Sequence, residues 1–381
     1  MNICLDARWI FPEITGIGLY TQELIAALVQ VPSDHTFTLL FRNAEVLERT
    51  RQHTHFDNNN RFSARLLTYG PFTLQNQLRL PLLLARLRCD LYHSTNFMMP
   101  LWRAGKTRYA VTIHDLIPLL FPDHAPKSKK TRIFPLYKKL MLEIGRRADL
   151  VITVSDSTRR DVLRELRIPD SGTHRVVSIP EGVDPFFQPG PPGPTRPEKV
   201  ILYVGRRDPY KNLPLLVEAL ATLRARGIPA RLRVIGPADA RYPEAPALAE
   251  KLGLQSHVDW IGYVTLEELR REYQTADVFC LPSRYEGFGL PVLEAMASGT
   301  PVVCSNIGSL PEVAGEAARL VNLANPADLA AALSDVLTNP DLAAHYRQRG
   351  LQRAHQFTWS HTAEQTLRSY DASAVWSRLA N

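Results

Sequence analysis

Short apolar runs alternate with helix-like patterns along the first half of the chain. Apolar positions at helical spacing predict helices over 16–30, about 78–87, about 129–147 and 156–166. The runs that read as strands lie between them, at 2–8, 36–41, 89–94, 109–115 and 149–155. Ser155 and Asp156 are expected to cap the helix that follows them. Strands that alternate with helices in this way favour a parallel sheet with right-handed crossovers.

A segment rich in Pro and Gly, 184–197, separates this half from a second alternation of the same kind. There we expect strands at 199–205, 230–236, 257–264 and 277–283, and helices at 212–227, 244–254 and 266–276. A helix beginning near Pro291, a buried strand beyond Gly299 and an amphipathic helix over 357–380 should follow.

The predicted fold class is therefore α/β, with two Rossmann-like, doubly wound parallel-sheet domains in tandem. We expect an N-terminal domain at 1–184, a linker at 185–197 and a C-terminal domain at 198–360. A last helix, 361–381, should pack back toward the N-terminal domain. Ligands of such sheets bind at the carboxyl ends of the strands, so two of these domains facing each other would form a cleft.

Composition is that of a cytoplasmic protein. A chain of 381 residues with 45% hydrophobic content can bury two cores. The four cysteines form no Cys-x-x-Cys pair, which favours small apolar core residues in a reducing compartment. Asp6 and Arg8 interrupt what would be the apolar part of a signal peptide, and no run reaches the roughly 18 apolar residues of a membrane-spanning helix.

The formal net charge of +7 belongs to the N-terminal half. Residues 1–185 hold 25 Lys and Arg against 18 Asp and Glu, whereas the remainder holds 20 of each class. The segment 127–147 concentrates this excess and alternates basic with apolar residues. It suits a helix on an anionic membrane surface, which would make the protein peripheral at the inner face of the cell membrane. The alternative is a helix whose apolar side faces the core and whose charges are solvated.

The stretch 282–303 carries two carboxylates around a glycine-broken turn. Glu286 precedes Gly287 and Gly289, and Glu294 falls in the helix that follows. The glycines let the backbone approach a ligand, and the amides of a helix start favour an anion such as a diphosphate. The two carboxylates are better used to accept hydroxyls, one from a sugar and one from a ribose. The alternative is an ordinary strand–loop–helix unit with a glutamate near its helix start.

A second candidate segment follows the strand at 199–205. Arg206 and Lys211 are spaced so that both could converge on one phosphate pair, where charge-assisted contacts would stabilise a leaving diphosphate. A solvated basic loop is the alternative, and Arg207 is expected to be the residue that faces solvent.

Two more strand ends carry candidate chemistry. Gly16 and Gly18 lie between the first strand and the first helix, where turns need glycine in any case. His114 and Asp115 follow a strand and should project at its carboxyl end. A lone histidine is more often a satisfied polar residue than a catalytic one.

Together these segments resemble the group 1 (family 4) glycosyltransferases, whose two-domain arrangement is called GT-B. The resemblance covers essentially the whole chain, and its strongest element is the E-x7-E pattern of Glu286 and Glu294. It implies a retaining hexosyltransferase with the catalytic residues Glu286, His114, Arg206 and Lys211. The donor-binding residues that it implies are Gly16, Gly18, Gly205, Gly262, Tyr263, Val264, Gly287, Phe288, Gly289, Leu290 and Glu294.

The resemblance also suggests roles and a donor. Glu294 would hold the ribose, Glu286 the sugar hydroxyls, and the turn at 260–264 the nucleobase. The chain looks most like the mannosyltransferase branch, which uses GDP-mannose or a related GDP-deoxyhexose. UDP-glucose and UDP-N-acetylglucosamine remain open, because Gly-Arg-Arg-Asp-Pro-Tyr-Lys-Asn at 205–212 replaces the family's usual Lys-Gly ending.

The acceptor is expected to be a glycan or a lipid-linked sugar. Residues near other strand ends are candidates for contacting it: Asp6, Arg8, Glu13, His93, Asn96 and Asp115. The segment that ends in Asp184 resembles the close of the family's N-terminal domain and should be structural. No Asp-x-Asp pair occurs, so we expect no metal and no cofactor, with basic residues and helix-start amides at the diphosphate instead. No nucleic-acid partner is expected.

Two rivals remain. The first is a nucleotide-sugar epimerase or a phosphorylase on the same fold. The epimerase would need carboxylates placed for proton abstraction and elimination, and it would convert a nucleotide sugar without any acceptor. A non-catalytic partner protein would be expected to have lost Glu286, Lys211 or His114, and all three are present.

Overall fold

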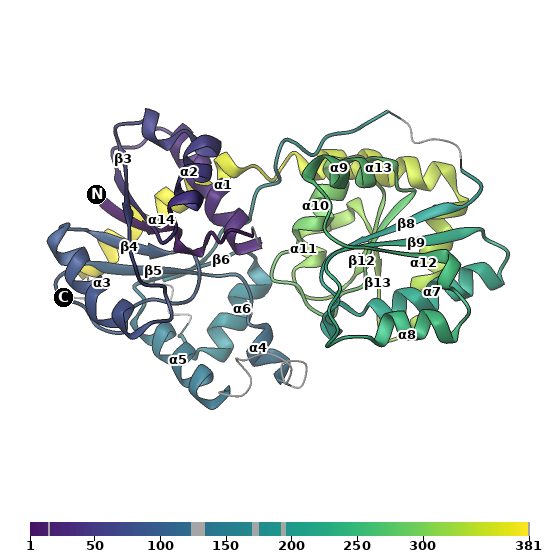
Figure 1. Cartoon of the computed structure of the whole chain (residues 1–381), viewed down its shortest axis with the longest axis horizontal. Helices are drawn as coiled ribbons and strands as arrows, with labels where there is room; N and C mark the ends of the chain where they lie inside the picture. The colour runs from purple at the N-terminus through teal and green to yellow at the C-terminus, as the bar shows by residue number, and fades with distance from the viewer. Residues whose placement is uncertain (14–15, 123–133, 170–174, 192–195, 380–381) are drawn as a thin grey trace. The chain divides into compact units, whose positions relative to one another are not determined.

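The computed structural model describes residues 1–13, 16–122, 134–169, 175–191 and 196–379. They fall into two compact units (Figure 1). Unit 1 holds the described residues within Met1–Leu119, Arg132–Gly182 and Thr358–Asn381, and unit 2 those within Leu120–Thr131 and Val183–Phe357. Figure 1 shows helices on both sides of each sheet, as in a doubly wound fold.

Unit 1 is built on a parallel sheet with the order β3-β2-β1-β4-β5-β6-β7. Its strands are β1 Asn2–Asp6, β2 Thr36–Phe41, β3 Phe62–Leu66, β4 Leu91–Ser94, β5 Arg108–Ile113, β6 Leu150–Thr153 and β7 Val176–Ser178. Five match the predicted runs. The two edge strands, β3 and β7, were not predicted, because polar residues interrupt β3, which is half exposed, and β7 has only 3 residues. Only their pairing with β2 and β6 defines them.

The helices of unit 1 confirm most of the periodic segments. They are α1 Gly16–Gln30, α2 Ala44–Thr54, α3 Leu74–Arg86, α4 Ile117–Leu120, α5 Phe134–Arg147, α6 Asp156–Glu165 and α14 Trp359–Leu379, with short 3-10 turns at Ala7–Trp9 and Phe56–Asn58. The Ser155 side chain accepts from the Thr158 amide and caps α6, as predicted, whereas Asp156 is the first residue of the helix and not its cap. The part of the expected basic helix before Phe134 lies outside the described residues.

The C-terminal helix α14 forms hydrogen bonds with two strands of unit 1 and with the segment after β7. The Tyr370 hydroxyl lies 2.6 Å from Nδ1 of His93 in β4, and Arg108 of β5 donates to the Ser373 hydroxyl at 2.6 Å. The Thr362 hydroxyl donates to the Pro180 carbonyl oxygen at 2.7 Å. Residues far apart in sequence therefore share one core.

Unit 2 has a parallel sheet with the order β10-β9-β8-β11-β12-β13. Its strands are β8 Lys199–Val204, β9 Ala230–Ile235, β10 Val258–Ile261, β11 Val278–Leu281, β12 Val302–Ser305 and β13 Arg319–Val321. Its helices are α7 Leu213–Ala225, α8 Glu244–Lys251, α9 Leu266–Thr275, α10 Leu290–Ala297, α11 Leu310–Ala314, α12 Pro326–Thr338 and α13 Pro340–Ala354, with 3-10 turns at Pro209–Lys211, Gln255–His257 and Gly315–Ala317.

Part of the expected linker packs onto unit 2. Phe187 is buried and lies edge-on to Tyr273 of α9, with the ring centroids 5.7 Å apart. Gln274 donates to the Gln188 carbonyl oxygen at 2.7 Å. Aromatic burial therefore outweighs the flexibility that the Pro and Gly content suggests for this segment. Residues 192–195 of the expected linker lie outside the described residues.

Among the helices of the described ranges, none combines the length and apolar character needed to cross a bilayer.

Candidate functional site

The turn before α10 brings a loop and a helix start together. Gly289 has a φ of +104°, in the left-handed region, and a Cβ there would lie 2.6 Å from Cδ2 of Leu310. Glycine is therefore needed for both backbone and space. The helix begins at Leu290, followed by Pro291, a residue that suits a first helical turn because it has no amide to satisfy.

Glu286 and Lys211 meet at the carboxyl edge of the unit 2 sheet. The Lys211 ammonium lies 2.7 and 2.8 Å from the two carboxylate oxygens of Glu286. The Ser283 hydroxyl donates to Oε1 of Glu286 at 2.5 Å. Lys211 follows β8 and Glu286 follows β11, which are neighbours in the sheet. Since both side chains are nearly buried, the pair is held with little competition from water.

Serines that the sequence did not single out hold this loop in place. The Ser309 hydroxyl lies within hydrogen-bond distance of two loop carbonyls, Glu286 O at 2.9 Å and Phe288 O at 2.7 Å. The Ser305 hydroxyl donates to the Ser283 carbonyl oxygen at 2.6 Å. These serines are some 20 residues from their partners, so no local pattern marks them. Only the adjacency of β11 and β12 brings them to the loop.

Glu294 is positioned from α9. It lies in α10, is 8% exposed and accepts from the Tyr273 hydroxyl at 2.7 Å. Burial, reinforced by the Glu294 carboxylate, raises the pKa of Tyr273 well above its usual value, so the phenol remains a donor. The contact fixes one oxygen of the carboxylate.

The two arginines after β8 differ in exposure. Arg206 has an exposed side chain, and its Nε donates to Asp208 at 2.8 Å. Arg207 instead lies over the Trp260 ring at 4.8 Å and is half buried, so it is not the solvated residue. Desolvation lowers the pKa of its guanidinium. The prediction for Arg207 is wrong because the indole face of β10 lies within its reach.

Close glycine contacts shape the ends of β8 and β9. Gly205 and Gly236 both have positive φ, +152° and +147°, and a Cβ on Gly236 would lie 2.1 Å from the Gly205 carbonyl oxygen. The turn with Gly262, Tyr263 and Val264 follows β10, and Tyr263 is 81% exposed. An exposed aromatic ring beside this edge is available for stacking.

In unit 1, His114 is held at the carboxyl end of β5. Its Nε2 donates to the Thr95 carbonyl oxygen at 3.0 Å, and its Nδ1 lies 3.3 Å from the Glu181 carboxylate. The Tyr20 ring packs edge-on against the imidazole, with the centroids 4.7 Å apart. The Asp115 carboxylate accepts from the Ile117 amide at 3.0 Å, which orders the loop. Glu181 was not among the predicted site residues.

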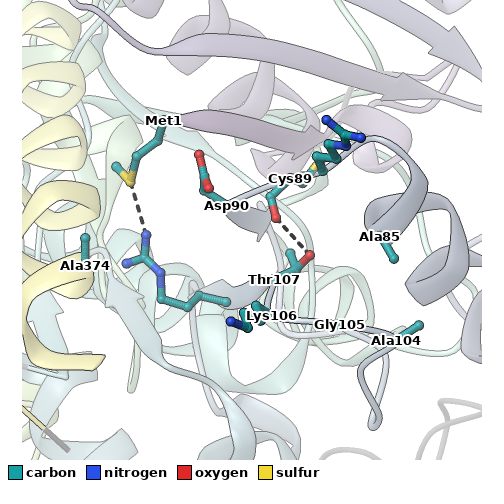
Figure 2. A pocket seen from close by; sticks show the side chains of 11 residues that line it. Met1, Ala85, Cys89, Asp90, Ala104, Gly105, Lys106, Thr107 and Ala374 are labelled. Atoms are coloured by element: carbon teal, nitrogen blue, oxygen red, sulfur yellow. Dashed lines mark hydrogen bonds between the residues drawn. The ribbon is translucent and has the colours of Figure 1, made fainter. Parts of the chain in front are cut away.

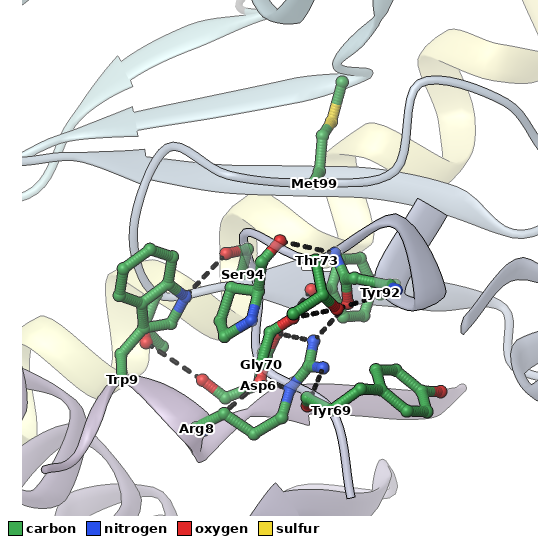
Figure 3. A network of polar contacts seen from close by, with 12 residues as sticks. Asp6, Arg8, Trp9, Tyr69, Gly70, Thr73, Tyr92, Ser94 and Met99 are labelled. Atoms are coloured by element: carbon green, nitrogen blue, oxygen red, sulfur yellow. Dashed lines mark hydrogen bonds and ion pairs between the residues drawn. The ribbon is translucent and has the colours of Figure 1, made fainter. Parts of the chain in front are cut away.

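The predicted acceptor residues Asp6 and Arg8 are enclosed (Figure 3). The Asp6 carboxylate accepts from Arg8 at 2.6 and 2.7 Å and from the Tyr92 hydroxyl at 2.6 Å. Arg8 also donates to Asn76 Oδ1 at 2.8 Å and to the Tyr69 carbonyl oxygen at 3.1 Å. Burial alone would lower the pKa of Arg8, but its pairing with Asp6 outweighs this and raises it. Since neither side chain is exposed by more than 1%, the network supports the loops and offers no surface to an acceptor.

His93 is enclosed as well. It is 0% exposed, and its ring nitrogens lie against the hydroxyls of Tyr370 and Thr112 at 2.6 and 2.9 Å. Burial, helped by the charge of His114, lowers its pKa to about 3, so the ring is neutral. Both ring nitrogens of His93 therefore form hydrogen bonds inside the core of unit 1 and do not face an acceptor.

The remaining candidates of unit 1 differ in exposure. Asn96 is nearly buried, and its side chain accepts from the Phe97 amide at 2.8 Å. Glu13 and Gly16 are exposed, whereas Gly18 is buried in the first turn of α1. The described residues contain no group of three His, Cys, Asp or Glu side chains arranged to hold a metal ion.

Two family models match consecutive parts of the chain. Residues 14–187 match the model described as Glycosyltransferase Family 4, and residues 188–353 match Glycosyl transferases group 1. Among curated relatives, the O-antigen chain mannosyltransferase B of Escherichia coli is 29% identical over 400 residues, covering 97% of this chain and 99% of the relative.

Solved structures agree on the fold. Sucrose-phosphate synthase from Thermosynechococcus elongatus superposes with a TM-score of 0.73 at 23% identity and covers 97% of this chain and 98% of that one. HepE from Anabaena, in complex with UDP-glucose, gives 0.72 at 16% identity over 98% of this chain and 100% of that one. With its two parallel-sheet α/β units, the chain therefore belongs to the group 1 and family 4 glycosyltransferases and has the GT-B fold.

Proposed function

We propose that the protein transfers a hexose, with retention of configuration, from a nucleoside-diphosphate sugar to a glycan or lipid-linked sugar. The favoured donor is GDP-mannose or a related GDP-deoxyhexose. Polysaccharide or lipopolysaccharide biosynthesis is the process that this activity would serve. The name of the Escherichia coli relative, an O-antigen chain mannosyltransferase, supports both the sugar and the process.

The arrangement around Lys211 carries the proposal. Two contacts from its ammonium go to Glu286, which leaves a third N–H to donate to a diphosphate oxygen. A carboxylate has about four acceptor sites, and Glu286 uses three in its contacts with Lys211 and Ser283. The fourth would accept a hydroxyl of the donor sugar.

The other diphosphate contacts would come from nearby groups. Arg206 has an exposed guanidinium that could leave Asp208 for phosphate oxygens, and the amides of Gly289 and Leu290 stand at the start of α10. Glu294 would accept the ribose hydroxyls with the carboxylate that the Tyr273 hydroxyl orients. We propose that these groups need no divalent metal ion.

The proposed reaction is a front-face displacement. The bond between C1 of the sugar and the diphosphate oxygen breaks, and a bond forms between C1 and the acceptor oxygen. The acceptor proton goes to the departing phosphate oxygen, so no side chain has to act as nucleophile. Lys211, Arg206 and the helix-start amides would stabilise the charge on the leaving group. His114 is assigned to the donor sugar by resemblance to the family.

The segment 127–147 is proposed to contact an anionic membrane surface while the protein remains cytoplasmic. Its described part, α5, exposes Leu136 and carries Arg146 and Arg147 in its last turn. A peripheral position would suit a lipid-linked acceptor.

A thermal-shift panel with GDP, UDP, ADP and dTDP, followed by their sugar conjugates and with and without magnesium, tests the donor. A preferential rise with GDP and GDP-mannose that does not need magnesium is expected. A rise with UDP alone would replace the donor and keep the mechanism. Conversion of a nucleotide sugar without an acceptor would favour an epimerase, and no response to any nucleotide would favour a non-catalytic partner.

A further inference from the structure

Large apolar side chains that remain exposed gather on one stretch of unit 1. Leu74, Leu78 and Leu82 are 72%, 53% and 47% exposed, and all three lie on α3, the helix with that label in Figure 1. Phe72, just before the helix, and Trp102, in the loop after β4, are 60% and 40% exposed. Large apolar side chains that cluster on an exposed surface usually mark an interaction site.

The leucines form a ridge because they are four residues apart on one helix. The opposite face of α3 anchors it, since Asn76, Leu80 and Leu84 are fully buried. Trp102 belongs to the same surface: its indole N–H donates to the Gln77 carbonyl oxygen at 2.5 Å. The ridge is therefore held in place on a rigid helix and turned away from the core. We call these leucines and Trp102 the α3 ridge.

Basic side chains border the α3 ridge. Arg79 and Arg86 are exposed on α3 next to the leucines. Between residues 61 and 108 the sequence contains 8 Lys and Arg and a single acid, Asp90. This stretch therefore carries a net positive charge, which would attract an anionic surface and repel a basic one.

Two hollows of unit 1 have cations in their linings, and each includes a residue of α3 or of the α3 ridge. One of about 740 Å³ lies at the amino-terminal edge of the sheet, between Ala85 of α3, Arg88, Lys106 and Met1 (Figure 2). Another of about 420 Å³ is lined by Trp102, Arg103 and Arg147, among others. The first places Arg88 and Lys106 near Ala85 and Met1, and its lining also includes Asp90. In the second, Arg103 pairs with Asp149 and Arg147 with Glu143, so the first is the stronger candidate for a lipid phosphate.

We propose that the α3 ridge and its basic border dock on the surface of an anionic phospholipid bilayer. The leucines and Trp102 would enter the region between headgroups and acyl chains, while the arginines and Lys106 would meet lipid phosphates. This surface is different from the segment 127–147, and it does not depend on which nucleotide sugar is used.

Vesicle flotation of the 381-residue chain tests the apolar part of the surface. The wild type should float with phosphatidylglycerol-containing vesicles and much less with phosphatidylcholine alone. The triple variant Leu74→Gln/Leu78→Gln/Leu82→Gln should lower partitioning by at least about tenfold, because three interfacial side chains are lost. Its melting temperature should be unchanged, since these positions are exposed.

Matched controls separate this surface from others. Leu252→Gln, an equivalent change at an exposed leucine of unit 2, should float like the wild type. If Leu136→Gln in α5 abolishes flotation and the triple variant does not, the membrane contact lies in 127–147 and the proposal is wrong. A wild type that binds no vesicle also overturns it.

The charged part is tested in the same assay. Arg79→Glu/Arg86→Glu should weaken binding to anionic vesicles and reduce its dependence on salt, whereas Arg226→Glu/Arg319→Glu on unit 2 should not. A second copy of this chain is the other possible occupant. If the wild type forms a dimer in sedimentation velocity, and the triple variant is monomeric while flotation is unaffected, the ridge is a self-association surface and the lipid proposal fails.

Discussion

The Lys211–Glu286 pair can be tested by a double-mutant cycle. Lys211→Met removes the ammonium and leaves the Glu286 carboxylate, 10% exposed, with the Ser283 hydroxyl as its remaining contact among those described above. Removing one partner of such an enclosed pair leaves an uncompensated charge and costs about 3 kcal/mol. Glu286→Gln leaves the ammonium in the same situation. The double variant leaves no unpaired charge, so its loss of unfolding free energy should be about 2 kcal/mol smaller than the sum of the losses of the two single variants.

Differential scanning calorimetry of the full chain is the assay. Two units need not unfold together, so the transition that nucleoside diphosphates shift is followed as that of unit 2. For a domain of this size 1 kcal/mol corresponds to about 2–4 °C, so each single variant should melt about 6–12 °C lower. Arg206→Met is the matched control, because its ion pair is exposed and should contribute less than about 1 kcal/mol. Single variants that melt within about 2 °C of the wild type, with additive effects in the double variant, would refute the coupling.

Three further predictions concern the buried groups and the donor site. The pKa of His93 is about 3 in the folded protein and about 6.5 unfolded, so only the unfolded chain gains a proton between these values as the pH falls. The contribution of neutral His93 to the free energy of unfolding should therefore be fully present above pH 6.5 and lower by about 2 kcal/mol at pH 5. In chemical denaturation, the His93→Gln variant should lack this part of the pH dependence of stability. Arg8→Met should destabilise unit 1 by about 3–5 kcal/mol by stranding Asp6, without changing nucleotide affinity measured by calorimetry. Glu294→Ala should weaken donor binding by about 1.5–3 kcal/mol, whereas Glu286→Ala should lower kcat more than affinity; if both keep wild-type kinetics, the assigned site is wrong.

Most of the fold could be predicted from local pattern. Buried parallel strands are continuous apolar runs, and amphipathic helices repeat every 3.6 residues, so both leave a signal in the sequence. The edge strands β3 and β7 leave almost none, because one is half exposed and the other is very short. Their identity depends on a neighbour elsewhere in the chain.

Some features of the candidate site could also be predicted from the sequence, and others could not. Glu286, Glu294, Arg206 and Lys211 stand out because they occur with glycines at strand ends, and unit 2 joins Glu286 to Lys211 directly. Arg207 is half buried because its guanidinium lies over the indole of Trp260, more than 50 residues away in the sequence. Local sequence patterns cannot reveal a contact between residues so far apart along the chain.

By itself the sequence determined the α/β class, the order of most helices and strands, and the strand ends that carry charged and glycine residues. These properties arise from neighbours along the chain, through backbone preference and the side on which apolar residues fall. Only the tertiary structure decided that Asp6, Arg8 and His93 are enclosed, that serines from β12 and beyond support the Glu286 loop, and that the leucines of α3 face outward. Burial and hydrogen bonding depend on which distant segments pack together, and a side chain's chemistry follows from that packing.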